Sequence, residues 1–199
     1  RITPDVLREF YRKYYHSGNC SVYVSGKVTP EIIRCIETNL GDTPWGEIRQ
    51  MPLLELIAPQ QTTEKHVFVE KADALQSSLK MGGFMMDRNH PDFLKARVMV
   101  TLFGGYFGSR LMSNIREDKG YTYGIGAGIV NCPGSGVLAI TTEADNQYID
   151  AIITEVYREM DRMCNDLAPQ EELEMVRSYM LGDFSRSYEG PFSLSEAWI

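Results

Sequence analysis

Residues 104–126 read GGYFGSRLMSNIREDKGYTYGIG, and this stretch decides the fold because it joins a helix to a strand. Two adjacent glycines weaken the preceding helix, and residues 109–117 have the composition of a second, short helix. Gly120 is suited to close that helix, because glycine adopts the left-handed conformation without strain. We therefore expect a strand to begin at Tyr121 and to run to residue 130.

Periodic patterns of apolar residues extend this order in both directions. They predict strands at residues 66–70, 75–84, 121–130 and 136–144, and helices at 91–107, 109–117, 147–165 and 169–188. Five residues with a proline and a glycine separate the last two strands, which indicates a hairpin. Because hairpins rather than crossovers link the strands, we expect an α+β fold: an antiparallel β-sheet with helices packed over one face.

The first 45 residues predict a smaller unit of helix, strand and helix, with the strand at residues 20–25. Residues 46–64 lack periodicity and contain Pro52 and Pro59, so we interpret them as a linker. The chain then divides into a remnant at 1–45, a linker at 46–64 and an α+β domain at 65–199. Because helical patterns reach both ends, we expect a piece of a longer polypeptide whose last domain is truncated.

The composition is that of an ordinary folded protein with an acidic surface. Of the 199 residues, 43% are hydrophobic and 24% are charged, and the net charge is −7. Such a domain lacks the basic surface that binds phosphate groups, which excludes nucleic acid and anionic membranes as expected partners. No apolar run reaches the roughly 18 residues of a membrane-spanning helix. A soluble protein is expected, but its compartment, cytoplasm or periplasm, is not readable from the sequence, because a targeting signal would lie upstream of this piece.

Motifs for metals, nucleophiles and phosphates are absent from the sequence. The three histidines, His16, His66 and His90, have no partner at zinc-ligand spacing. There is no G-x-S-x-G, and the glycines of 104–108 lack the G-K-[ST] of a phosphate loop. We therefore assign no metal ligand to this chain. The cysteines are widely spaced, which predicts buried apolar residues rather than disulfides; they are Cys20, Cys35, Cys132 and Cys164.

The stretch at 104–126 resembles the second-domain signature of the insulinase, or pitrilysin, family of zinc metallopeptidases. That signature is G-G-x-F-x-S-R-L, a short helix ending in R-E-x-x-G, and a strand containing Y-G. Residues 10–26 resemble the helix-strand-helix that closes the family's first domain, and Gln76 and the His90-Pro91-Asp92 start of a helix also fit. The resemblance covers nearly the whole chain. It implies the fold that this family shares with the mitochondrial processing peptidases.

Two site residues follow from the resemblance. The family's peptidases hold zinc in the first domain through H-x-x-E-H and a downstream glutamate, and a later domain contributes an arginine and a tyrosine seven residues apart. Arg116 and Tyr123 match by position. The resemblance implies that both are catalytic and substrate-binding residues, which donate hydrogen bonds to the substrate backbone and to the oxyanion of the intermediate. Without the resemblance, Arg116 would be a surface residue paired with Glu117, Asp118 or another surface acid, and Tyr123 a half-buried sheet residue.

Two neighbours of these residues need separate interpretation. Strand alternation places Tyr121 and Tyr123 on the same face, so periodicity does not separate them, and the choice of Tyr123 rests on the motif. Arg110 also belongs to the signature, and we interpret it as a structural residue that bridges helix and sheet.

The resemblance implies the non-zinc half of a zinc metalloendopeptidase that hydrolyses peptides or small unfolded polypeptides. Zinc is expected in the missing domain or in a partner subunit, so this chain alone should be inactive. The expected partners are that zinc-bearing domain or subunit and a peptide substrate, and a homodimer is left open. The alternative is a non-catalytic scaffold or interaction subunit of the same family. A third hypothesis, a small-molecule-binding domain, requires a well-formed apolar pocket.

Overall fold

The computed structural model describes residues 2–46, 62–132 and 134–198. The chain divides into two compact units, Leu56–Met180 on the one hand and Arg1–Glu55 with Leu181–Ile199 on the other, and each is described by itself. The linker predicted at 46–64 falls mostly on residues 47–61, which lie outside the described residues. The predicted domain boundaries therefore stay a prediction.

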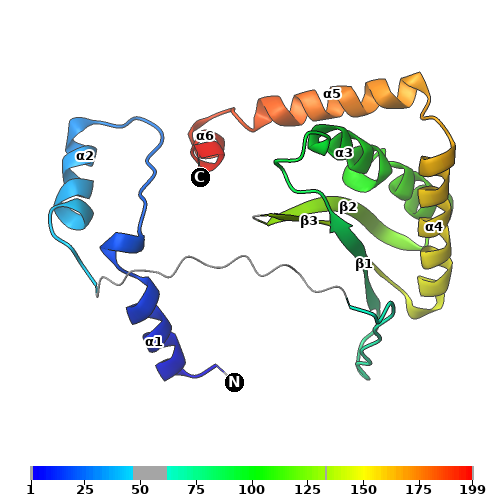
Figure 1. Cartoon of the computed structure of the whole chain (residues 1–199), viewed down its shortest axis with the longest axis horizontal. Coiled ribbons are helices and arrows are strands. Elements are labelled where there is room, and N and C mark those ends of the chain that lie inside the picture. The colour runs from blue at the N-terminus through cyan, green and yellow to red at the C-terminus, as the bar shows by residue number, and fades with distance from the viewer. Residues whose placement is uncertain (1, 47–61, 133, 199) are drawn as a thin grey trace. The chain divides into compact units, whose positions relative to one another are not determined.

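The unit Leu56–Met180 is built on a three-stranded antiparallel sheet (Figure 1). Its strands are β1 (Ser77–Met85), β2 (Thr122–Cys132) and β3 (Ser135–Ala144), in the spatial order β1-β3-β2. β2 and β3 form the predicted hairpin, which closes where Cys132 faces Ser135. β1 pairs with β3 along its whole length, so β3 is the central strand.

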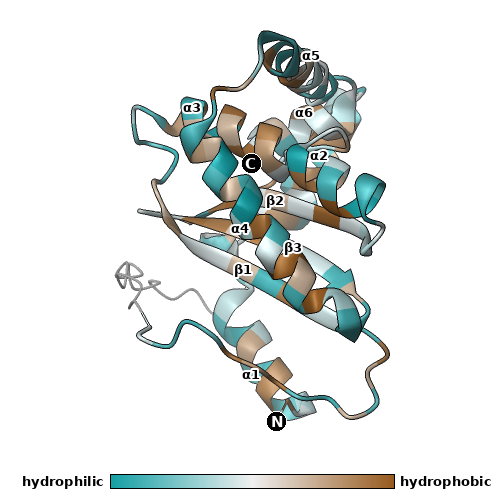
Figure 2. Cartoon of the chain, turned by 90° about the vertical axis from the view of Figure 1, so that its right-hand side faces the viewer, coloured by the Kyte–Doolittle hydropathy of each residue, from teal (hydrophilic) through white to brown (hydrophobic). Residues whose placement is uncertain are grey.

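Helices cover one face of this sheet. They are α3 (Phe93–Val100), the π-helical turns η3 (Thr101–Gly105) and η4 (Met112–Asp118), the short turn η5 (Asn146–Tyr148) and α4 (Ile149–Asn165). In Figure 2, α4 lies in front of the sheet. The buried core between helices and sheet consists of Phe103, Leu111, Ile115, Ile125, Ile140, Ala144, Ile152 and Val156. The predicted α+β architecture, an antiparallel sheet with helices over one face, is confirmed.

The connection from η4 to β2 is a tight turn. Gly120 has a φ of 65°, in the left-handed region that glycine adopts without a Cβ clash. Its amide donates to the carbonyl of Arg116, and the amide of Tyr121 donates to the carbonyl of Ile115, both at 3.1 Å. These bonds satisfy carbonyls at the end of η4 and lead the chain directly into β2.

β2 begins with an irregularity that decides where its side chains point. Its register with β3 shifts between Thr122 and Ile125. Both of these side chains are buried although they are three residues apart, which a regular strand does not allow. Tyr123, between them, is 91% exposed.

Two threonine hydroxyls hold this bulge. Thr122 Oγ1 donates to the carbonyl oxygen of Glu143 at 2.6 Å and accepts a hydrogen bond from the amide of Gly124 at 3.2 Å. Thr142 Oγ1 lies 2.8 Å from the carbonyl oxygen of Gly124 and 2.9 Å from Thr122 Oγ1. The hydroxyls thus pair with backbone groups that the shifted register removes from the regular ladder.

The unit formed by Arg1–Glu55 and Leu181–Ile199 is helical in its described part. Its elements are α1 (Pro4–Tyr14), η1 (Ser17–Asn19), α2 (Pro30–Ile36), η2 (Glu37–Gly41) and α6 (Pro191–Trp198), and α5 (Gln170–Arg186) begins in one unit and ends in the other. Thr3 and Thr29 cap α1 and α2 through their hydroxyls, each before a proline. Neither α1 nor α2 has a buried residue.

Two strand predictions are wrong: residues 20–25 and 66–70 form no strand. Local alternation of apolar residues indicates that a segment is able to be a strand, but a strand forms only where a neighbour pairs with its backbone groups. In the described parts of the chain, no strand pairs with either segment.

The prediction of buried cysteines is also wrong, because Cys20, Cys35, Cys132 and Cys164 are all free and exposed. Two of them show why: Cys132 ends β2 at the hairpin tip, and Cys164 lies in the last turn of α4, both beyond the helix–sheet core. None of the helices in the described residues is long and apolar enough to cross a membrane.

Replacing Thr142 by valine tests the hydroxyl network of the bulge. The change keeps the β-branched shape but leaves the Gly124 carbonyl and Thr122 without this partner, so the free energy of unfolding should fall by about 1–2 kcal/mol. Urea denaturation measures it. Thr141→Val, an exposed position on the same strand, is the matched control and should change stability by less than about 0.5 kcal/mol. Equal effects of the two substitutions would contradict this role of the network.

Candidate functional site

Arg116 lies near the end of η4 and is held against the start of β2. Its Nε donates a hydrogen bond to the backbone carbonyl oxygen of Tyr123 at 2.8 Å. Its guanidinium carbon lies 4.6 Å from the ring centroid of Phe107 and 5.6 Å from that of Tyr123. The structure thus brings together the two residues that the sequence singles out. The structure also places Phe107 beside them. We call Arg116, Tyr123 and Phe107 together the Arg116 cluster.

Arg116 also contacts the acid beside it. Its Nη1 forms an ion pair with the carboxylate of Glu117, the contact expected of an ordinary surface arginine. However, only 25% of the Arg116 side chain is exposed. Among the described residues, nothing accepts a hydrogen bond from its Nη2. The pair with Glu117 therefore leaves a donor of Arg116 available.

Tyr123 and Tyr121, which alternation did not separate, have different surroundings. The Tyr123 side chain is exposed rather than half-buried. Tyr121 precedes β2 and packs against the core, with its ring centroid 5.0 Å from that of Tyr148. The bulge that follows Thr122 is the physical reason, because it breaks the alternation that would give both tyrosines the same face. Of the two, Tyr123 is the accessible one.

The Arg116 cluster combines two kinds of hydrogen-bond donor with an aromatic surface. A guanidinium is a permanent cation with donors in a planar fork, and a phenol donates a single O–H. Both suit the carbonyl oxygens and carboxylates of a peptide. Because the cluster lies on a helix end and the strand that directly follows it, its supports are rigid elements rather than loops.

The sequence signature includes Phe107, as the F of G-G-x-F-x-S-R-L, but the sequence alone assigned it no role in the site. Its side chain is 65% exposed, and a phenylalanine between two glycine-rich turns gives no periodic signal. The available signal was the signature itself, in which Phe107 precedes the short helix that carries Arg116.

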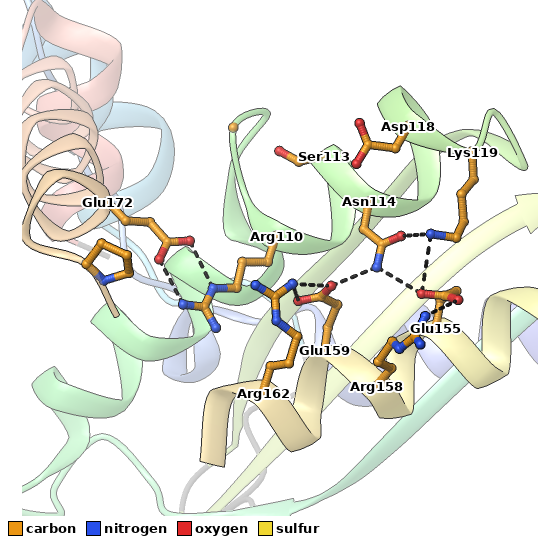
Figure 3. Close-up of a pocket in the computed structure, with 12 residues that line it drawn as sticks. Arg110, Ser113, Asn114, Asp118, Lys119, Glu155, Arg158, Glu159, Arg162 and Glu172 are labelled. Carbon is orange, nitrogen blue, oxygen red and sulfur yellow. Dashed lines mark hydrogen bonds and ion pairs between the residues drawn. The ribbon is translucent and has the colours of Figure 1, made fainter. Parts of the chain in front are cut away.

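A polar pocket of about 560 Å³ lies between η4, α4 and the start of α5 (Figure 3). Most of its charged side chains pair with one another: Arg110 with Glu172 at 2.8 Å, Lys119 with Glu155 at 3.5 Å, Arg158 with Glu155 at 3.3 Å and Arg162 with Glu159 at 3.0 Å. The amide of Asn114 joins them by donating to Glu155 and Glu159, at 3.0 and 2.7 Å. The pocket therefore lacks the apolar walls that the small-molecule hypothesis requires.

Arg110 is held by a bidentate pair with Glu172 of α5, with nitrogen–oxygen distances of 2.9 and 2.8 Å. Its predicted structural role agrees with this geometry, but the predicted partner is wrong, because Arg110 joins two helical segments rather than helix and sheet. The side chains are 8% and 24% exposed. The hydrogen bonds from Arg110 hold the pKa of Glu172 below its usual range, and they outweigh the opposite effect of burial.

The described residues do not fit a zinc site. In this part of the chain no three histidine, cysteine, aspartate or glutamate side chains are grouped around a common point. His90 uses its Nδ1 to accept a hydrogen bond from the amide of Asp92 at 3.1 Å, and His16 is buried by itself in the other unit.

Comparisons with known proteins place these features in a family. The family model described as the peptidase M16 inactive domain matches residues 1–180. An uncharacterized zinc protease of Bacillus subtilis, YmxG, is 24% identical over 185 residues, which cover 93% of this chain and 44% of that protein. An uncharacterized zinc protease of Rickettsia bellii is 26% identical over 189 residues, or 93% and 43% of the two chains. A Helicobacter pylori protein named a non-peptidase homolog is 26% identical over 127 residues, or 63% and 28%. This chain thus spans less than half of the length of these curated relatives.

Solved structures show the same fold. The peptidase M16 inactive domain from Pseudomonas fluorescens superposes with a TM-score of 0.66 at 23% identity, over 92% of this chain and 44% of that one. A protease from Helicobacter pylori superposes with a TM-score of 0.77 at 16% identity, over 100% and 48% of the two chains. At these identities the likeness supports the fold alone.

Replacing Glu172 by glutamine tests the pair that ties Arg110, just before η4, to α5. At pH 7 the substitution should lower the free energy of unfolding by about 2 kcal/mol, less than for a fully buried pair because Glu172 is 24% exposed. Urea denaturation at several pH values measures it. Lys95→Gln, which removes an exposed pair with Asp92, is the control and should cost under about 0.5 kcal/mol.

The pH dependence of this difference has a definite sign. Because the pKa of Glu172 is lowered in the folded protein, its contribution is complete above the unfolded value near 4.5 and is lost as the pH falls through the folded value. The gap between wild type and Glu172→Gln should therefore shrink below about pH 4.5. A gap that stays constant down to pH 2 would show that the carboxylate charge is not what stabilises the pair.

Proposed function

Because this chain belongs to the peptidase M16 inactive-domain family of zinc proteases, as the signature at 104–126 indicates, we propose that it is the non-zinc half of a metalloendopeptidase. In this proposal it binds the backbone of peptides or small unfolded polypeptides and stabilises the transition state of their hydrolysis. The Arg116 cluster is the observation that carries the proposal. It presents a guanidinium donor and an exposed phenol side by side on rigid supports.

Each donor has a role that its chemistry suits. As water adds to a peptide carbonyl, negative charge develops on the carbonyl oxygen, and donors already aimed at that oxygen stabilise the charge without reorganising. We assign this task to Tyr123 Oη and to the free Nη2 of Arg116. Those N–H or O–H groups of Arg116 and Tyr123 that do not contact the oxyanion would donate to other backbone carbonyl oxygens of an extended substrate. Every residue of a peptide carries such an oxygen, so this binding does not depend on the substrate's side chains.

The metal belongs to another part of the protein in this proposal. The described residues do not form a zinc site, so we place zinc in the other domain of the same polypeptide or in a partner subunit. The domain division 1–45, 46–64 and 65–199 is part of the same proposal, with residues 1–45 closing a preceding domain. Its support is that α1 and α2 are capped helices with exposed apolar side chains; among these are Val6, Leu7, Phe10, Tyr11, Ile32 and Ile33.

A scaffold without peptidase activity is the second candidate function. One observation favours it: a relative from Helicobacter pylori is named a non-peptidase homolog. In that case the Arg116 cluster would have no substrate, and Arg116 and Tyr123 would be replaceable. The two functions thus differ in what mutation of the cluster does.

Substitution of the two donors tests the peptidase role. Arg116→Ala and Tyr123→Phe, each in the protein assembled with its zinc-bearing half, should lower kcat/KM by roughly 10²-fold, the scale of an oxyanion donor. Hydrolysis of internally quenched peptides measures it. The matched controls are Arg97→Ala and Tyr157→Phe, an exposed arginine and an exposed tyrosine outside the cluster. Unchanged kcat/KM in both cluster variants would remove the site assignment, and no hydrolysis by the wild-type assembly would favour the scaffold.

The assignment of zinc to the other half is tested on this chain alone. Purified and dialysed against zinc at low micromolar concentration, the chain should retain far less than one zinc ion per molecule and should cleave no peptide. Elemental analysis and the same quenched peptides measure both properties. One zinc ion retained per molecule, together with peptide hydrolysis, would place the metal site in this chain and overturn the proposal.

A further inference from the structure

Phe107 is an apolar side chain that lies outside the hydrophobic core. It is 65% exposed, whereas Phe103, four residues earlier, is 3% exposed and belongs to the core. Its ring faces the cation of Arg116, whose guanidinium carbon lies 4.6 Å from the ring centroid. An exposed aromatic ring over a guanidinium gains cation–π attraction and orders a long, flexible side chain.

The backbone around Phe107 forms a tight, well-defined turn. The amide of Ser109 donates to the carbonyl of Tyr106 at 3.1 Å, which closes a tight turn around Phe107 and Gly108. Tyr106 stacks on Tyr179, with 5.0 Å between the ring centroids. A Cβ at position 108 would come within 2.8 Å of the Tyr106 ring, so the turn needs glycine there. Because this turn is held on both sides, Phe107 is presented as part of a rigid segment.

The guanidinium of Arg116 is consequently held by chemically different groups, and the Phe107 ring, at 4.6 Å, lies closer to it than the Tyr123 ring, at 5.6 Å. The Tyr123 carbonyl oxygen accepts from Nε, the Glu117 carboxylate pairs with Nη1, and the Phe107 ring covers a face. These contacts leave Nη2, the atom that the proposed function gives to the substrate, without a partner among the described residues. A flexible arginine would lose entropy on binding substrate, whereas one already ordered loses less.

We propose that Phe107 is a positioning residue, whose ring face holds Arg116 in the orientation that presents Nη2 to the substrate. This inference rests on the proposed function, since it assigns Phe107 a role through Arg116. Phe107 itself touches no reacting atom. Its effect depends on the aromatic face and not on bulk, because only a π-system attracts the cation.

The test uses variants that separate the ring face from apolar bulk, in the assembled protein with an internally quenched peptide. Phe107→Ala and Phe107→Leu should both lower kcat/KM roughly fivefold, the scale of an exposed cation–π contact, while Phe107→Trp should restore wild-type values. Phe84→Ala removes another exposed phenylalanine, 51% accessible, from β1 and should leave kcat/KM unchanged. In the Arg116→Ala background, Phe107→Ala should have no further effect, because the two residues act as a unit.

A spectroscopic readout on this chain makes the inference independent of activity. The Nε–H proton of Arg116 donates to the Tyr123 carbonyl and should give a slowly exchanging NMR signal that Phe107→Ala and Phe107→Leu weaken and Phe107→Trp preserves. An unchanged signal in Phe107→Ala, or wild-type activity in Phe107→Leu, would overturn the positioning role. If Arg116→Ala leaves hydrolysis intact, the proposed function fails, and the link of Phe107 to substrate fails with it. The NMR signal still decides whether the ring holds the guanidinium.

Discussion

Leu111 and Ile115 are fully buried in the core between the helices and the sheet. The position of the Arg116 cluster depends on this packing. The two side chains are four residues apart, so they share one face of a helical segment and fix its rotation. Arg116 follows Ile115 directly and is therefore carried to the flank of the buried face. Gly120 then turns the chain into β2 within a few residues, which brings Arg116 and Tyr123 together. The core thus determines the position of the polar cluster.

Much of the fold follows from the sequence because its signals are local. Periodicity located all three strands of the sheet and the long helices, and turn residues located the hairpin and the end of η4. The predictions that failed concern interactions with residues distant in the sequence. Residues 20–25 and 66–70 have strand patterns, but their backbone groups find no strand in the described residues. Likewise, the sequence indicated a structural role for Arg110. It did not identify the ion-pair partner, because Glu172 lies 62 positions further along the chain.

The candidate site was predictable only in part, for a similar reason. The motif located Arg116 and Tyr123, while alternation failed to separate Tyr123 from Tyr121. The separation depends on the bulge, which is held by a hydrogen bond between the hydroxyls of Thr122 and Thr142, residues on different strands. Phe107 had no periodic signal because its contact is with a charge rather than with the core. Cross-strand hydrogen bonds and cation–π pairs become visible only when the chain is folded.

The mixed chemistry around Arg116 has a consequence for the ionic conditions in which the site keeps its shape. Dissolved salt screens exposed charge pairs, with a Debye length of about 8 Å at physiological ionic strength and about 3 Å at 1 M. Such screening weakens the half-exposed pair with Glu117, whereas the Tyr123 carbonyl and the Phe107 ring carry no net charge and lie in direct contact. The contacts of Arg116 with the Tyr123 carbonyl and the Phe107 ring therefore persist in concentrated salt. The orientation of the Arg116 guanidinium should consequently depend little on salt concentration, although the group itself is charged.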